Sequence, residues 1–170
     1  ENEIKYELCG KLIVATNEAE LPRLDELHRR GTENGVPGLE MVDAARLREI
    51  EPECAGIRGL WSPNTGIIDY TEVTRAYASN LTRNGGEIIL GARLLGVDKR
   101  DDGFNLHTTA GDIEATYVVN CAGLYSDRVA TLMGLPASVR IIPFRGEYYF
   151  LAPSAHRLVR GLIYPVPDPR

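Results

Sequence analysis

The residues with the clearest chemical potential form a turn of small side chains, Cys121-Ala122-Gly123, at the end of the apolar run Tyr117–Cys121. An alanine and a glycine let the backbone approach a flat or phosphorylated ligand with no bulky side chain in between. The helix predicted to follow directs its first amide groups to the same place, which favours anionic groups. An ordinary strand-to-helix connection has the same composition, and for the turn taken alone this structural interpretation is favoured over a ligand site.

Metal and disulfide chemistry find little support in the sequence. His28, His107 and His156 lie far apart with no partner at helical spacing, and each is interpreted as a surface residue rather than a metal ligand. The three cysteines are scattered and form no CxxC pair, which favours a reduced intracellular compartment. No two glycines are separated by a single residue, so the GxGxxG turn that binds a dinucleotide pyrophosphate is absent.

Composition excludes several classes of function. The chain has 170 residues, of which 44% are hydrophobic and 25% charged, an ordinary globular balance. Its net charge of −5 argues against nucleic acid as a partner, because phosphate binding favours a basic surface. No apolar run approaches the roughly 20 residues that a membrane span requires, and no secretory leader is visible. The chain begins with Glu1 and stops in a proline-rich segment, which indicates an interior piece of a longer protein.

The elements expected around the turn alternate between strand and helix periodicity. The apolar runs at 87–90 and 117–121 are predicted to be buried strands of a parallel sheet. Three alternating segments between them, separated by turns rich in aspartate and glycine, predict an antiparallel meander. The expected order is a helix at 70–84, the strand at 87–90, meander strands at 94–98, 104–108 and 113–115, the strand at 117–121 and a helix at 125–133.

The outer segments predict a second group of elements that need not share a sheet with the middle of the chain. Asp43 is the expected N-cap of one of its helices, and Cys9-Gly10 is a candidate bulge or close approach. The expected elements are strands at 6–15, 39–42 and 56–61, helices at 18–30 and 43–50, and longer strands at 139–151 and 158–166 joined by a loop around Pro153-Ser154. The sequence therefore predicts the α/β (α+β) class.

Several motifs resemble the FAD-binding D-amino-acid oxidase superfamily, and most closely its L-2-hydroxyglutarate dehydrogenase/oxidase branch. The likeness covers essentially the whole chain. Its two most specific motifs are PFRGEYYFL and IYPVPDP, whereas a CAG turn before a helix is shared by many flavoproteins. The motifs that carry it are CGKLIVA (9–15), GLEMVDAARLREIEP (38–52), TGIIDY (65–70), CAGLYSDRVA (121–130), PFRGEYYFL (143–151) and IYPVPDP (163–169).

The resemblance implies two interleaved domains. Residues 69–137 would be the distal half of a Rossmann-like FAD-binding domain with a three-stranded meander. Residues 1–68 and 138–170 would be two parts of a substrate domain built on a mixed sheet. Leu94 would lie against the adenine ring of FAD, and Cys121, Ala122 and Gly123 would lie along its ADP portion.

The same resemblance places Arg145, Tyr149 and Tyr164 on the sheet that faces the substrate. A guanidinium binds a carboxylate bidentately, and a dicarboxylate 2-hydroxy acid offers two such groups. An ion pair between Arg145 and Glu147 is an equally good interpretation of the arginine. Strand alternation also allows Tyr148 and Tyr149 to divide into one packed and one solvated ring, and Tyr164 to be an aromatic at a strand end.

The expected function belongs to the full-length protein, an FAD-dependent enzyme that oxidises L-2-hydroxyglutarate or a related 2-hydroxy acid to the 2-oxo acid. The alternatives are an amine or amino-acid oxidase or a glycerol-3-phosphate dehydrogenase of the same superfamily, and a non-enzymatic domain that binds a small carboxylate or a protein. Partners would be the carboxylate substrate and oxygen or a quinone as electron acceptor, in the cytoplasm or at the periphery of the inner membrane. The catalytic base is not assigned.

The isolated chain is expected to be inactive. Without the GxGxxG turn, which the family carries ahead of these residues, it is not expected to retain FAD. Apolar sheet surface left uncovered in such a piece favours a homo-oligomer.

Overall fold

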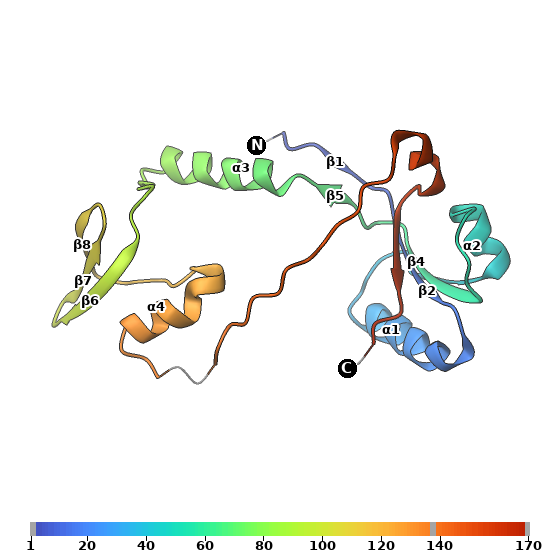
Figure 1. Cartoon of the computed structure of the whole chain (residues 1–170), viewed down its shortest axis with the longest axis horizontal. Helices are drawn as coiled ribbons and strands as arrows, with labels where there is room; N and C mark the ends of the chain where they lie inside the picture. The colour runs from blue at the N-terminus through green and yellow to red at the C-terminus, as the bar shows by residue number, and fades with distance from the viewer. Residues whose placement is uncertain (1–2, 137–138, 169–170) are drawn as a thin grey trace. The chain divides into compact units, whose positions relative to one another are not determined.

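The computed structural model describes residues 3–136 and 139–168. By their contacts, the residues form two compact units: Glu1–Asn80 together with Tyr149–Arg170, and Leu81–Tyr148. Each unit contains both strands and helices, which confirms the mixed α/β class. Figure 1 shows the elements in chain order.

The first unit is built around a mixed sheet with the strand order β3-β4-β2-β9. β3 and β4 are antiparallel, as are β4 and β2, whereas β2 and β9 are parallel. A separate antiparallel pair joins β1 to β5. The elements of this unit are β1 (Tyr6–Glu7), β2 (Lys11–Ala15), η1 (Glu18–Glu20), α1 (Leu21–Glu33), β3 (Glu40–Asp43), α2 (Ala44–Ile50), β4 (Arg58–Ser62), β5 (Ile67–Ile68), most of α3 (Tyr70–Arg83), η3 (Pro153–Leu158) and β9 (Leu162–Pro165).

Helices pack on both faces of the mixed sheet. Leu24 of α1 lies in a buried cluster with Ala15 and Leu60, whereas Leu47 of α2 lies in another with Leu12 and Val42. Neighbouring residues of a strand point to opposite faces, so the two clusters occupy opposite sides of the sheet. The core of this unit is therefore divided by β2, which contributes side chains to both sides.

Local signals explain where the helices of this unit begin. Asp43 is the predicted N-cap of α2, and its carboxylate accepts a hydrogen bond from the Arg46 backbone N–H at 2.8 Å. At the start of α3, the Asp69 carboxylate accepts from the Thr71 backbone N–H at 2.7 Å. Both helices lie within about one residue of their predicted bounds.

The predicted strand at 6–15 is divided in two, with β1 ending at Glu7 and β2 starting at Lys11. The break lies at Gly10, whose φ is +74°. A Cβ at this position would overlap the ring of Trp61, at 1.8 Å from its nearest atom. The predicted close approach is therefore confirmed, and it interrupts the strand because a left-handed residue turns the chain out of the pleat.

The second unit contains the predicted meander. Its strands are antiparallel in the order β6-β7-β8, and α4 contacts β6. The helix predicted at 125–133 is confirmed, with a short 3-10 turn ahead of it. The elements are β6 (Leu94–Arg100), β7 (Gly103–Thr108), β8 (Gly111–Ala115), η2 (Gly123–Tyr125) and α4 (Ser126–Leu132).

Three predicted strands are wrong. The structure has no strand at 87–90, 117–121 or 139–151. Residues 139–151 form an extended coil (Figure 1). Most apolar side chains of the three segments are exposed, to 86% for Leu90 and 87% for Tyr117. An isolated strand leaves its backbone N–H and C=O groups without partners, and the described residues supply no neighbouring strand for these segments.

The C-terminal prediction is only partly correct. The strand expected at 158–166 is shorter, since β9 covers Leu162–Pro165. The loop expected around Pro153-Ser154 is instead the 3-10 helix η3, which begins at Pro153. Proline favours the first turn of a helix because its φ is already fixed and its missing N–H has no partner to lose there.

Candidate functional site

The predicted turn Cys121-Ala122-Gly123 lies on the surface of the second unit, and all three residues are exposed. Gly123 has a φ of +55°, and no atom lies within 4 Å of the position that a Cβ would occupy. The backbone therefore meets open space here, as the approach of a flat ligand requires.

Asn120, which the sequence interpretation missed, holds this turn in shape. Its side-chain oxygen accepts a hydrogen bond from the Ala122 N–H at 3.2 Å, and its side-chain NH₂ donates to the Ser126 carbonyl at 2.8 Å. The Tyr125 N–H closes the turn on the Ala122 carbonyl at 3.0 Å. An asparagine just before a glycine-containing turn is a usable sequence signal, because its side chain mimics a backbone turn.

Leu94, the predicted adenine contact, opens β6 in the same unit as the turn. It is half-buried and pairs with Thr108, and the register shifts between Leu94 and Gly96. Such an irregularity bends a strand and redirects its side chains. Because α4 contacts β6, Leu94 and the turn before α4 belong to one folded body.

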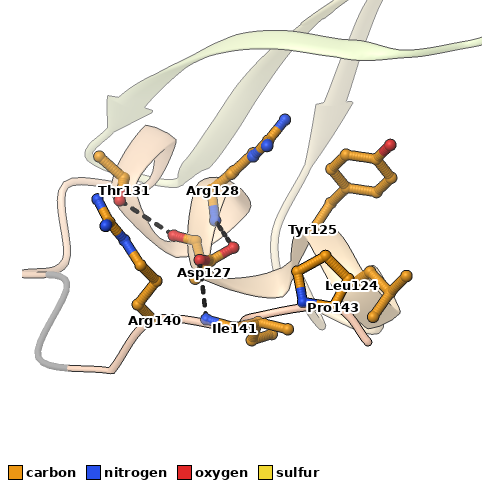
Figure 2. Close-up of a pocket in the computed structure, with 8 residues that line it drawn as sticks. All are labelled: Leu124, Tyr125, Asp127, Arg128, Thr131, Arg140, Ile141 and Pro143. Carbon is orange, nitrogen blue, oxygen red and sulfur yellow. Dashed lines mark hydrogen bonds between the residues drawn. The ribbon is translucent and has the colours of Figure 1, made fainter. Parts of the chain in front are cut away.

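A cavity of about 670 Å³ lies beside α4 and is drawn in Figure 2. Asp127 lies at its centre, and its carboxylate accepts from the backbone N–H groups of Arg128 at 2.8 Å and Ile141 at 3.1 Å. The hydrogen bond from Ile141 holds the pKa of Asp127 below its usual value, and the Arg128 N–H acts in the same direction. The lining residues are Leu124, Tyr125, Asp127, Arg128, Thr131, Arg140, Ile141 and Pro143.

Arg145 and Tyr149, two of the predicted substrate contacts, lie in the coil at 139–151. The Arg145 side chain is 86% exposed and pairs with Glu147 at 3.6 Å, so the ion pair weighed from the sequence is present. Tyr148 and Tyr149 are exposed to 87% and 96%, so the alternation expected of a strand is absent. Arg145 belongs to the second unit and Tyr149 to the first.

Tyr164 lies on β9 in the first unit and is 48% exposed. It is paired with Ile13 of β2, so both side chains lie on the face of the sheet that carries α1. The ammonium of Lys11 stands 4.6 Å from the centre of the tyrosine ring, within the range of a cation–π contact. Lys11 and Tyr164 are thus in contact. The sequence did not reveal this pair because the two residues lie some 150 positions apart along the chain.

His107 is also more connected than its interpretation as a surface residue suggested. Its Nε2 and Nδ1 lie 2.9 Å from the carboxylates of Asp98 and Asp112, respectively. These two carboxylates, Asp98 first, raise the pKa of His107. Register on the meander brings the three residues together, which spacing along the chain did not predict. Across residues 3–136 and 139–168, no cluster of three or more acidic, His or Cys side chains is suited to a metal ion.

Glu51 is a further residue that the sequence left unassigned. It is 2% exposed, and its carboxylate accepts hydrogen bonds from the backbone N–H groups of Arg160 and Gly161. Nearby, burial raises the pKa of the Cys54 thiol, and the charge of Glu51 adds to that rise. A glutamate before a proline gives no signal of burial, so this residue was accessible only from the structure.

The residues around the turn are those expected to contact one part of FAD. The open backbone at Gly123 would allow a phosphate linkage to approach closely, and Leu94 at the irregular start of β6 is an apolar side chain of the kind that contacts a flat ring. These residues would hold the adenine and ADP portion, whereas the described chain carries no GxGxxG turn for the pyrophosphate.

The comparisons with known proteins give the class of protein to which the chain belongs. The family described as FAD dependent oxidoreductase (DAO) matches residues 1–170, and the chain belongs to this family. The structure of L-α-glycerophosphate oxidase from Mycoplasma pneumoniae, solved with FAD bound, shares the fold with a TM-score of 0.76 and 20% identity. That match covers 96% of this chain and 44% of the oxidase.

Within this family, the chain is similar to proteins named L-2-hydroxyglutarate dehydrogenase. The chain is 42% identical over 172 residues to the mitochondrial L-2-hydroxyglutarate dehydrogenase of Caenorhabditis elegans, covering 98% of this chain and 40% of that protein. It is 40% identical over 179 residues to the human mitochondrial protein of the same name, covering 98% of this chain and 39% of that protein. The chain thus spans about 40% of the length of the relatives it matches.

Proposed function

We propose that the full-length protein containing this chain oxidises L-2-hydroxyglutarate, or a closely related 2-hydroxy acid, to the corresponding 2-oxo acid. The observation that carries the proposal is 42% and 40% identity to two L-2-hydroxyglutarate dehydrogenases over 98% of the chain. The likeness includes the segments with Arg145 and Tyr164, residues of types that bind carboxylates. Solved structures of lower identity support only the fold.

In this proposal, Arg145 binds a substrate carboxylate. Its side chain is 86% exposed and forms an ion pair of 3.6 Å with Glu147. A surface pair of this kind contributes little, so a substrate carboxylate can replace it with two parallel hydrogen bonds. Tyr149 and Tyr164 would orient the substrate through their hydroxyl groups.

Leu94 and the turn Cys121-Ala122-Gly123 would hold the adenine and ADP portion of the cofactor. FAD, when bound, supplies the acceptor for the hydride that leaves C2 of the substrate. The hydroxyl proton of the substrate must pass to a base, to which no residue of this chain is assigned. The contribution of these 170 residues is therefore binding and orientation.

We propose that residues 1–68 and 138–170 belong to a substrate domain and 69–137 to an FAD-binding domain. The compact units of the structure have bounds after Asn80 and after Tyr148. The two divisions differ over residues 69–80, which include most of α3, and over most of the coil at 139–151. For the electron acceptor we propose oxygen or a quinone.

For the compartment we propose the cytoplasm, with peripheral binding at the inner membrane if a quinone is the acceptor. The scattered cysteines support a reducing compartment. In the described part of the chain, no helix combines the length and apolar character that crossing a membrane requires. The human relative is named as mitochondrial, so fractionation of cells is the relevant measurement.

The deciding experiment is a substrate screen of the full-length protein with bound flavin and a dye acceptor. We expect turnover of L-2-hydroxyglutarate, little turnover of the D enantiomer, and release of 2-oxoglutarate. Turnover confined to glycine, sarcosine or glycerol 3-phosphate would instead assign the protein to another activity of the same superfamily. The isolated 170 residues, purified in parallel, are expected to show no flavin absorbance.

A further inference from the structure

Glu51 is a buried carboxylate that backbone amides hold in place. It follows the last residue of α2 and is 2% exposed. The Arg160 N–H donates to both carboxylate oxygens, at 3.1 and 3.0 Å, and the Gly161 N–H donates to one of them at 2.5 Å. A buried carboxylate is costly unless such hydrogen bonds replace its water.

No ion pair of Glu51 is found among the described residues. The guanidinium of Arg160 is directed instead at the backbone carbonyl of Glu49, at 3.4 Å. The negative charge is therefore matched by N–H dipoles of one specific stretch of backbone, residues 160–161. That stretch lies about 110 positions further along the chain.

The amides that Glu51 binds lie immediately before β9. The next N–H, that of Leu162, donates to the Gly10 carbonyl at 3.2 Å and starts the pairing with β2. A Cβ on Gly161 would lie 2.5 Å from the Cys9 carbonyl oxygen, so the backbone passes here with no room for a side chain. The entry to β9 is thus fixed between Glu51 on one side and the start of β2 on the other.

β9 requires such a fixed entry because its own pairing is short. It is an edge strand, and its pairing with β2 runs from Lys11–Leu162 to Val14–Pro165. A slip of one residue in register would move every side chain of β9 to the other face of the sheet. Tyr164 would then leave the face that carries Ile13 and the ammonium of Lys11.

We propose that Glu51 is a positioning residue for the substrate site: it sets the register of β9 and so holds Tyr164 on the face with Lys11. The proposal rests on the proposed function, in which Tyr164 contacts the carboxylate substrate. Glu51 acts through Tyr164 and does not touch the substrate.

The test uses the full-length protein with bound flavin and compares Glu51→Gln with Glu49→Gln as its matched control. Glu49 lies two residues away and pairs through its side chain with Arg46 on the surface at 2.7 Å. Hydrogen–deuterium exchange of the peptide spanning residues 158–166 is measured first. We expect exchange about tenfold faster in Glu51→Gln and unchanged in Glu49→Gln, and unchanged exchange in Glu51→Gln would overturn the proposal.

Steady-state kinetics then test whether the effect reaches Tyr164. Glu51→Gln should raise KM for L-2-hydroxyglutarate roughly tenfold with a smaller change in kcat, since a small misplacement of a binding group is costly. The effect should disappear in the Tyr164→Phe background, because the two residues act in series. Equal effects in both backgrounds, or faster exchange with no change in KM, overturn the positioning role.

Two further variants, Glu51→Asp and Tyr164→Phe, separate loss of folding from loss of positioning. If Glu51→Gln does not fold, Glu51→Asp keeps the charge while shortening its reach, and the same faster exchange and raised KM are expected of it. If Tyr164→Phe has no effect on any substrate, the role of Tyr164 in the proposed function fails. The exchange measurement still decides whether Glu51 holds β9.

Discussion

The unit that contains β2 and β9 buries its apolar side chains, whereas the unit that contains the meander leaves many of its own exposed. Leu12, Leu24 and Leu47 of the first unit have no exposed surface. In the second unit, Leu90, Tyr117 and Val119 expose between 84 and 87% of theirs. Within the described residues, every fully buried apolar side chain belongs to the first unit.

The difference follows from which strands pair. In the first unit, β2 pairs with strands that come about 50 and 150 positions later, and helices pack on both faces. In the second, each meander strand pairs with the next one along the chain. Local pairing satisfies backbone groups but brings few distant side chains together, so it builds little core. A buried side chain of the first unit should therefore respond to substitution through folding, and an exposed side chain of the proposed site in the second unit through ligand binding.

The largest effect on stability is expected for Leu47→Ala in the first unit. Leu47 has no exposed surface and packs against Leu12, Val14 and Val42. Its truncation should lower the free energy of unfolding by about 2–5 kcal/mol. In the isolated 170-residue chain, the fluorescence of Trp61, its single tryptophan, reports on this cluster during urea unfolding. The matched control is Leu95→Ala in β6. Leu95 is 52% exposed, so its truncation should change the free energy of unfolding by less than about 0.5 kcal/mol. Equal shifts would refute the contrast between the units.

Arg145→Ala should show the opposite behaviour, with a large effect on substrate binding and none on folding. Loss of the guanidinium should raise KM for the dicarboxylate by roughly thirtyfold or more, corresponding to about 2 kcal/mol. The urea midpoint should not move, because the side chain is 86% exposed. Arg145→Lys should recover part of the loss, since a lysine lacks the bidentate fork. Glu147→Gln is the control, and its KM should be unchanged or lower; an unchanged KM in Arg145→Ala would remove this residue from the site.

The same contrast explains how far the sequence could predict the fold. Caps and turns depend on neighbours along the chain, so the Asp43 cap and the meander were predicted correctly. The runs at 87–90 and 139–151 have the apolar composition of strands, yet a strand forms only beside a partner. Composition carries no information about whether that partner is present.

Residues of the candidate site likewise differ in whether a local sequence signal identifies them. The turn at Cys121–Gly123 was found because glycine has a local conformational signature. Glu51 and the pair of Lys11 with Tyr164 depend on contacts over more than 100 positions, and neither has a local signature. Polar residues that act through distant backbone are therefore those that sequence reasoning misses.

A smaller effect is expected for Asn120→Ala, which removes the side chain that shapes the turn. The hydrogen bonds of Asn120 to Ala122 and Ser126 should contribute about 1 kcal/mol to the bound form of the turn. In the full-length protein, the dissociation constant for FAD should rise about fivefold. Flavin fluorescence measures it, and Asn105→Ala on the meander is the control, since its side chain donates a hydrogen bond to Asp112 of the neighbouring strand β8. Similar losses in both variants would show that the turn has no special part in binding FAD.

The smallest effect is a pH dependence confined to the meander. Asp98 and Asp112 raise the pKa of His107 above its ordinary value of about 6.5. The protonated form is therefore favoured in the folded state, and its contribution to stability is fully present below about pH 6.5. It is lost as the pH rises through the raised pKa of the folded protein. Because the three side chains are solvent-accessible, the change should be small and should shrink further as salt is added.

NMR titration of the His107 ring measures the pKa directly, and His107→Asn should remove this part of the pH dependence from urea midpoints recorded between pH 5.5 and about 8.5. A His107 pKa at or below that of a free histidine would mean that the two carboxylates do not act on it.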